Sequence, residues 1–123
     1  MLYLLDTANV NKIRKAYESY PIDGVTTNPT IISKEKTDFV TLIKEIRGII
    51  GRDGMIHIQT TKIDTEGIIK EAIALRDFVN GNFYIKIPTI KFCAKVIHYF
   101  LKPNYFCIFY YSSIFFLPDK FNN

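Results

Sequence analysis

Short apolar runs alternate with amphipathic stretches over about the first 88 residues of this chain. Four of the runs have the length and composition of buried strands, and they are residues 2–6, 24–26, 55–59 and 83–87. The three stretches between them repeat apolar side chains at helical spacing. Candidate N-caps for the first and third stretches stand at Thr7 or Asn9 and at Asp64 or Thr65. This alternation predicts an α/β protein with a parallel sheet and right-handed crossovers.

The two faces of the predicted strands differ in polarity. Successive side chains of a strand point to opposite faces. One face is apolar and is expected to pack against helices; it holds Tyr3, Leu5, Val25, Ile56, Ile58, Phe83, Ile85 and Ile87. The other face gathers polar groups toward the carboxyl ends of the strands, namely Asp6, Thr26, His57, Gln59, Tyr84 and Lys86. A doubly wound sheet has helices on both faces, whereas a closed barrel keeps helices outside and a site in its C-terminal mouth. The pattern therefore favours the N-terminal half of a (β/α)₈ TIM barrel, with four parallel strands in sequential order.

Residues 91–123 have a different composition from residues 1–90. Eleven of the residues from 92 to 123 are Phe or Tyr, none is Gly, and Asp119 is the only acid. We expect an unrelated aromatic-rich tail here, with no domain assigned and no regular barrel strand after Pro88. Such an aromatic mass favours association unless something covers it. The sudden loss of pattern is typical of a shifted reading frame in AT-rich DNA.

Charge and cysteine content exclude several kinds of partner. The net charge is +4, and most of the basic residues, Arg47 among them, are expected on solvated helix surfaces between acids, unlike a nucleic-acid footprint. The two cysteines, Cys93 and Cys107, match no metal or redox spacing. The first ten residues have neither a basic leader nor an apolar run long enough to cross a membrane. We expect no metal, nucleic acid or membrane partner, and a cytoplasmic location.

Lys86 is the most informative single residue because it places an ammonium group inside an apolar strand, Tyr84–Pro88. Desolvation disfavours the charged form of an amine, and a neutral amine attacks a carbonyl to form an imine. The alternative is a strand lysine that extends to water or pairs with an acid. The polar neighbours expected on the same face favour the nucleophile.

Four of those neighbours are candidate site residues, each with a simpler alternative. Asp6 can pair with the lysine or hold a substrate hydroxyl, or it can serve as an acid near a helix N-terminus. Thr26 and Asn28 offer a hydroxyl and a carboxamide, although Pro29 also makes Asn28 a turn residue. Gln59 can hold a water or a hydroxyl, or have no role. His57 lies deeper and is expected to be a satisfied core histidine.

Three segments resemble the transaldolase family in the right order: Leu4–Ala8, Gly24–Ile32 and Tyr84–Pro88. The family's members are (β/α)₈ barrels that act as class I aldolases or transfer a dihydroxyacetone unit, without a metal or organic cofactor. The resemblance implies that Lys86 is the Schiff-base nucleophile, that Asp6 and Asn28 surround it, and that Gln59 lies near a proton-shuttling water. It also implies a sugar phosphate or dihydroxyacetone as the small-molecule partner.

The identity of residue 59 favours one branch of the family. Gln59 resembles the pattern of the small fructose-6-phosphate aldolases, and a Glu there resembles that of transaldolases proper, which remain the alternative. The resemblance ends at Pro88, and the family's later proton donors and phosphate-binding residues have no counterpart. We therefore expect an inactive, poorly soluble product that associates through its open edges or its tail. A non-enzymatic remnant, and a module whose aromatic tail docks a partner, are the alternatives of another class.

Overall fold

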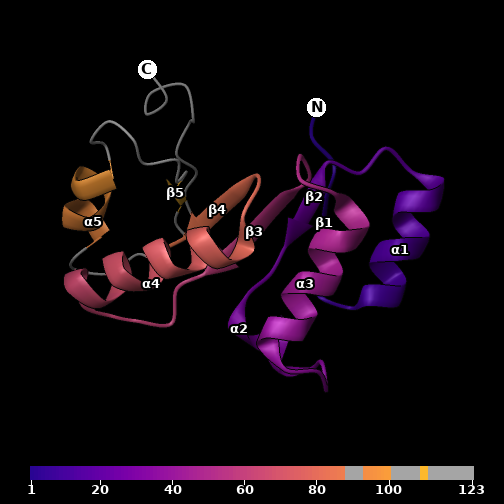
Figure 1. Ribbon diagram of the computed structural model, residues 1–123. Coiled ribbons are helices and arrows are strands. Elements are labelled where there is room, and N and C mark those ends of the chain that lie inside the picture. The colour runs from indigo at the N-terminus through magenta and orange to yellow at the C-terminus, as the bar shows by residue number, and fades with distance from the viewer. Residues whose placement is uncertain (88–92, 101–108, 111–123) are drawn as a thin grey trace.

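The computed structural model describes residues 1–87, 93–100 and 109–110. Its strands form one parallel sheet in the order β1-β2-β3-β4-β5 (Figure 1). The strands are β1 (Leu4–Asp6), β2 (Gly24–Thr26), β3 (Met55–Gln59), β4 (Phe83–Lys86) and β5 (Phe109–Tyr110). The first strand lies at the edge and not between two others, so the sequential order expected for half of a barrel is confirmed.

Helices follow the strands, and side-chain caps mark where four of them begin. The helices are α1 (Val10–Ser19), α2 (Pro29–Ser33), α3 (Phe39–Ile50), α4 (Thr65–Val79) and α5 (Cys93–Phe100). The caps of the first four are Asn9, Asn28, Asp38 and Asp64, whose side-chain oxygens each accept a hydrogen bond from a main-chain N–H three residues on. Such caps satisfy donors that the first helical turn leaves without a partner. Figure 1 shows α3 and α4 lying across the strands, with α1 beside α3 and α5 beside α4.

The apolar face of the sheet forms the core together with the helices. The strand residues Val25, Ile56, Ile58, Phe83, Ile85 and Ile87 are all buried, as expected from their parity. Against them pack helix residues that include Ile13, Leu42, Ile43, Ile46, Ile68 and Ala72. The expectation for Tyr3 was wrong, because its side chain is 50% exposed. The strand begins only at Leu4 and lies at the sheet edge, where no strand on its outer side covers Tyr3 within the described part of the chain.

Two parts of the expected element order need correction. Three helices were expected before the fourth strand, but α2 adds a short one because Asn28 caps it and Pro29 fits its first position. No strand was expected after Pro88, yet β5 pairs in parallel with β4, with Lys86 opposite Tyr110. Between them, α5 packs against α4 and buries Val96. Apart from residues 93–100 and 109–110, the expected aromatic-rich tail at 91–123 lies outside the described residues.

None of the helices that the structure describes is both long and apolar enough to cross a membrane.

Candidate active site at the carboxyl ends of the strands

The register of the sheet brings the predicted site residues to one face. Asp6 pairs with Thr26, Thr26 with His57, and His57 with Tyr84, so these four form one row across the strands. Gln59 pairs with Lys86 in the next row toward the carboxyl ends. Paired residues of neighbouring strands share a face, and residues two apart on one strand do too. We call this side, opposite the apolar core, the inner face.

The Lys86 amine is held at the carboxyl end of β2. Its Nζ donates hydrogen bonds to the main-chain oxygen of Thr27 at 2.7 Å and to Oγ1 of Thr26 at 3.2 Å. The side chain is half-buried, and this burial lowers the pKa of the amine, while the Asp6 carboxylate acts in the opposite direction. A larger fraction of Lys86 is therefore neutral at a given pH than of an exposed lysine.

Thr27 is the site residue that sequence reasoning missed. It is fully buried, and both its main-chain N–H and its hydroxyl donate to the main-chain oxygen of His57, at 3.0 and 2.8 Å. These bonds fix the end of β2 against β3 and aim the Thr27 carbonyl oxygen at Lys86. The only signal in the sequence is the extended backbone that Pro29 imposes just after this strand.

Asp6 and Gln59 lie on β1 and β3, the strands on either side of β2, whose end binds the amine. Asp6 ends the edge strand β1, is exposed, and pairs in register with Thr26, whose Oγ1 accepts a hydrogen bond from the Lys86 amine. Its carboxylate opposes the lowering of the Lys86 pKa by burial. Gln59 is partly buried beside Lys86, and the next residue, Thr60, donates its N–H to the main-chain oxygen of Lys86 at 3.0 Å. The structure thus brings together Asp6, Thr26, Gln59 and Lys86.

Asn28 has a structural function that the sequence left as an alternative. Its Oδ1 accepts the N–H of Ile31 at 2.8 Å and so caps α2. The carboxamide oxygen is therefore engaged in the fold, and the NH₂ group is the part of Asn28 that suits a substrate oxygen.

His57 is buried, as expected, with 5% of its surface exposed. Its ring stacks on that of Tyr84, with centroids 4.6 Å apart and an angle of 13° between the planes. Burial, and to a lesser extent the nearby Lys86 charge, lowers the pKa of His57 to about 4. The imidazole is consequently neutral near pH 7.

Acid is expected to destabilise the fold through His57. Its folded pKa of about 4 lies below the value of 6.5 for an ordinary histidine, so the unfolded chain binds the extra proton first. The stabilisation is complete above pH 6.5 and is lost as the pH falls to 4, by about 3 kcal/mol in the free energy of unfolding. Urea titrations at pH 7, 5.5 and 4 measure it, with His57→Phe as the control that lacks the proton site. Equal pH dependence in the two proteins would contradict the assignment.

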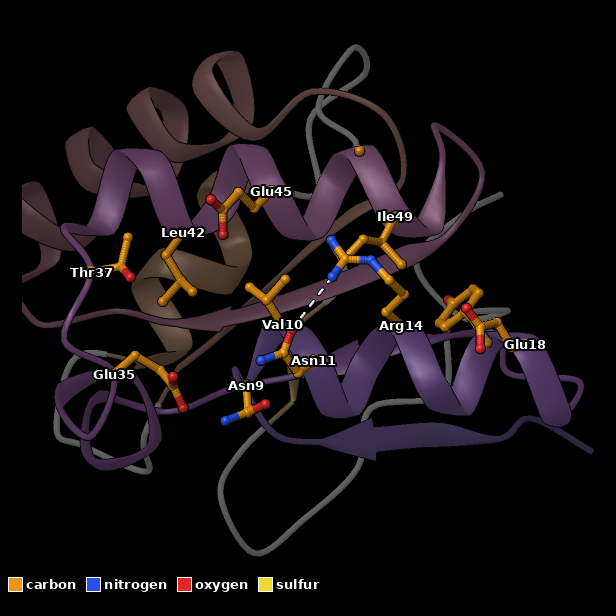
Figure 2. A pocket seen from close by; sticks show the side chains of 12 residues that line it. Asn9, Val10, Asn11, Arg14, Glu18, Glu35, Thr37, Leu42, Glu45 and Ile49 are labelled. Carbon is orange, nitrogen blue, oxygen red and sulfur yellow. Dashed lines mark hydrogen bonds between the residues drawn. The ribbon is translucent and has the colours of Figure 1, made fainter.

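A separate hollow lies on the helical side of the sheet. A groove of about 960 Å³ runs between α1 and α3 and is lined by polar and charged side chains of both helices. Figure 2 shows Arg14 and Asn11 from α1 joined by a hydrogen bond and facing Glu45 and Ile49 of α3. None of the candidate site residues lines this groove. Within the described residues, no group of three or more His, Cys, Asp or Glu side chains is placed to hold a metal ion.

Comparison with known proteins identifies the family of the chain. Residues 3–107 match the family model described as transaldolase/fructose-6-phosphate aldolase. A "probable transaldolase" of Geobacter metallireducens is 40% identical over 113 residues, which cover 89% of this chain and 51% of the relative. A "probable fructose-6-phosphate aldolase" of Streptococcus pneumoniae is 37% identical over 106 residues, 85% of this chain and 48% of the relative. A "probable transaldolase" of Thermoanaerobacter is 47% identical over 88 residues, 72% of this chain and 39% of the relative.

The chain spans about half, or less, of the length of these relatives. The matched range continues past residue 90, where the boundary with a tail was expected. Because the family model matches most of the 123 residues, the chain belongs to the transaldolase/fructose-6-phosphate aldolase family.

Proposed function

We propose that this chain carries the imine-forming half of a class I aldolase site, with Lys86 as nucleophile. The observation that supports it most strongly is the Lys86 amine itself. It is half-buried on the inner face, its pKa is lowered by burial, and Thr26 and Thr27 hold it at the carboxyl ends of the strands. In barrels, side chains at this end of the strands carry the chemistry.

The proposed reaction begins when neutral Lys86 attacks a ketone carbonyl. A C–N bond forms, the carbonyl oxygen leaves as water, and the product is a protonated imine. When the neighbouring C–C bond breaks, its electron pair moves into the imine and produces an enamine, while the hydroxyl proton passes to a base and an aldehyde leaves. Protonation of the enamine carbon and addition of water then release the second product and regenerate the amine.

Four other residues have proposed roles in this sequence. Asp6 lies within electrostatic reach of Lys86 and can balance its charge or accept a hydrogen bond from a substrate hydroxyl. Gln59 is placed to hold the water that carries protons, since a carboxamide both donates and accepts. Thr26 and the NH₂ group of Asn28 are proposed to bind substrate oxygens.

We propose a phosphorylated ketose, such as fructose 6-phosphate, as substrate, with simple aldol cleavage as the reaction. Gln59 and the named relative of Streptococcus pneumoniae favour this choice. Transfer of a dihydroxyacetone unit to an aldehyde acceptor is the second candidate, supported by the relatives named as transaldolases. Product formation with and without an added aldose phosphate acceptor distinguishes the two reactions.

Reductive trapping tests the proposed nucleophile independently of turnover. The purified chain is incubated with dihydroxyacetone and borohydride, which reduces an imine to a stable amine, and the modified residue is located by peptide mass mapping. Adduct concentrated on Lys86 supports the proposal. Adduct spread evenly over the exposed lysines contradicts it.

We expect a polypeptide of these 123 residues to cleave fructose 6-phosphate far below ordinary enzyme rates. Positioned acid–base groups contribute about 10²–10⁴-fold in rate, and their effect is greatest where water is excluded. Here Asp6 is exposed, and so are the apolar side chains Leu2 and Leu4 at the β1 edge. A coupled assay for released glyceraldehyde 3-phosphate, alongside Lys86→Ala, measures the rate. Turnover near 1–10³ s⁻¹ that depends on Lys86 would refute the expectation and favour completion of the site by a second copy.

A further inference from the structure

The side chain of Lys86 crosses a whole strand to reach its hydrogen-bond partners. Lys86 belongs to β4, whereas the acceptors of its Nζ belong to the end of β2, and β3 lies between these strands. Thr26 pairs with His57, and Lys86 pairs with Gln59. The path from Lys86 to Thr26 therefore runs diagonally over β3, between Gln59 and His57 on the inner face.

The aromatic rings of His57 and Tyr84 lie in the row below this path. They are direct partners in the register of β3 and β4, and their stacking at 4.6 Å makes a flat double ring. His57 is only 5% exposed, although it lies on the inner face and not on the face that packs against the helices. Its main-chain oxygen also accepts both bonds from Thr27, the residue that binds the Lys86 amine. His57 thus lies one register row below the path of the Lys86 side chain, and its main-chain oxygen anchors Thr27, the acceptor of the Lys86 amine.

We propose that the stacked rings of His57 and Tyr84 form a positioning platform that holds the aliphatic arm of Lys86 across β3 and directs its amine to Thr27. The inference rests on the proposed function, in which Lys86 is the nucleophile. His57 is a positioning residue in this scheme, because it acts through Lys86 and no contact between the imidazole and a substrate is required.

The platform acts through its shape and its apolar faces at neutral pH. Among the side chains that the structure describes, the titratable groups on the inner face near Lys86 are Asp6 from β1, His57 from β3 and Tyr84 from β4. The Thr26 hydroxyl from β2 also contacts the amine, and in the backbone register Lys86 pairs with Tyr110 of β5. The pKa of His57 is lowered to about 4, so the imidazole brings no charge beside the amine near pH 7. A phenylalanine ring at position 57 should therefore replace it, whereas a small side chain should leave the Lys86 arm without support and open it to water.

The test compares His57→Phe with His57→Ala in the full chain, with Ile58→Val as the matched control. Ile58 neighbours His57 on β3 but faces the core, so its substitution perturbs packing without touching the inner face. Two readouts are measured on each protein at several pH values. One is trace acetylation of each lysine, which reports the pKa and reactivity of Lys86 without any ketone. The other is borohydride trapping of dihydroxyacetone.

We expect His57→Ala to slow trapping on Lys86 by about 10²-fold, the size of effect that a misplacement of about 1 Å causes, and to raise the pKa of Lys86 toward that of exposed lysines. His57→Phe and Ile58→Val should retain wild-type values within a few-fold. If His57→Ala does not fold, Tyr84→Leu removes the other ring and should show the same slowed trapping and the same rise in pKa.

The outcomes separate this inference from the proposed function. Trapping and acetylation of Lys86 that are unchanged in His57→Ala, or in Tyr84→Leu, overturn the platform while leaving Lys86 as nucleophile. A loss in His57→Phe equal to that in His57→Ala also overturns it, since an imidazole-specific role would then be required. If wild type traps no ketone, but acetylation shows the expected rise in the Lys86 pKa in His57→Ala and not in His57→Phe or Ile58→Val, the platform stands and the proposed nucleophile falls.

Discussion

Replacing Lys86 with methionine is expected to abolish trapping of dihydroxyacetone above the background of surface lysines. Methionine keeps most of the length and volume of the aliphatic arm but has no amine, so no C–N bond can form. The wild-type preference for Lys86 follows from its lowered pKa, because a larger fraction of this amine is neutral at pH 8 than of exposed amines. Borohydride trapping followed by peptide mapping measures the loss.

Two further variants test whether the loss of trapping is specific to the Lys86 amine. Lys86→Arg keeps a cation that can donate to Thr26 and Thr27, but a guanidinium stays protonated and forms no imine under these conditions. Lys70→Met removes an exposed lysine from α4 and should leave trapping unchanged. An adduct yield in Lys86→Met equal to that of wild type would show that another amine is the nucleophile.

Replacing Arg47 with alanine is expected to lower the free energy of unfolding by about 4 kcal/mol. The Arg47 guanidinium donates to six main-chain carbonyl oxygens, those of Gly51, Arg52, Gly54, Val79, Asn80 and Asn82. These carbonyls belong to the chain that leaves α3 and to the chain that leaves α4, so one side chain joins the segments that lead into β3 and β4. Hydrogen bonds to a charged group contribute about 1.5–3 kcal/mol each, but only those to Val79, Gly54 and Asn82 are part-buried, and two of these three are longer than 3.0 Å. Water can replace the donor at the exposed carbonyls, so we expect a loss well below the sum of six bonds.

The Arg47 experiment has two controls on the same helix. Lys44→Ala removes an exposed cation from α3 and should change the free energy of unfolding by less than about 0.5 kcal/mol. Arg47→Lys keeps the charge but loses the planar fork, so it should recover only part of the stability. Urea titration at pH 7 measures all three proteins. A loss below about 1 kcal/mol in Arg47→Ala would mean that water replaces the guanidinium at these carbonyls.

The environment of Arg47 did not follow from its place in the sequence. Its place among charged residues on a helix predicted a solvated surface cation, and that interpretation was wrong because the guanidinium is partly buried and bound to main-chain oxygens. Burial lowers the pKa of Arg47, yet the group has no side-chain motif that marks it. Two of its closest acceptors, Gly54 and Asn80, lie 7 and 33 residues away in the chain. Every residue type has a main-chain carbonyl oxygen, so the sequence does not indicate which of these oxygens accept hydrogen bonds from Arg47.

The period of the hydrophobic pattern was enough to predict the two faces of the sheet. A strand alternates its side chains between two faces, so residue type alone placed Ile56, Ile58 and Ile85 in the core and Lys86 on the inner face, as the burial and register confirm. The same alternation along the chain predicted parallel strands in sequential order. The pattern did not predict two local features. Asn28 and Pro29 start the short helix α2, and Tyr3 lies exposed beside an edge strand.

The surroundings of the candidate nucleophile were decided only by the tertiary structure. The sequence marked Lys86, Asp6, Thr26 and Gln59 as neighbours, since each stands near the carboxyl end of a strand on one face. It did not indicate that the Lys86 amine reaches across β3 to the Thr27 carbonyl, or that His57 stacks on Tyr84 beneath that path. Those contacts depend on the register between strands and on the reach of a flexible side chain. Both are set by the packing of the whole sheet, whereas the face on which a residue lies follows from its place in the strand alone.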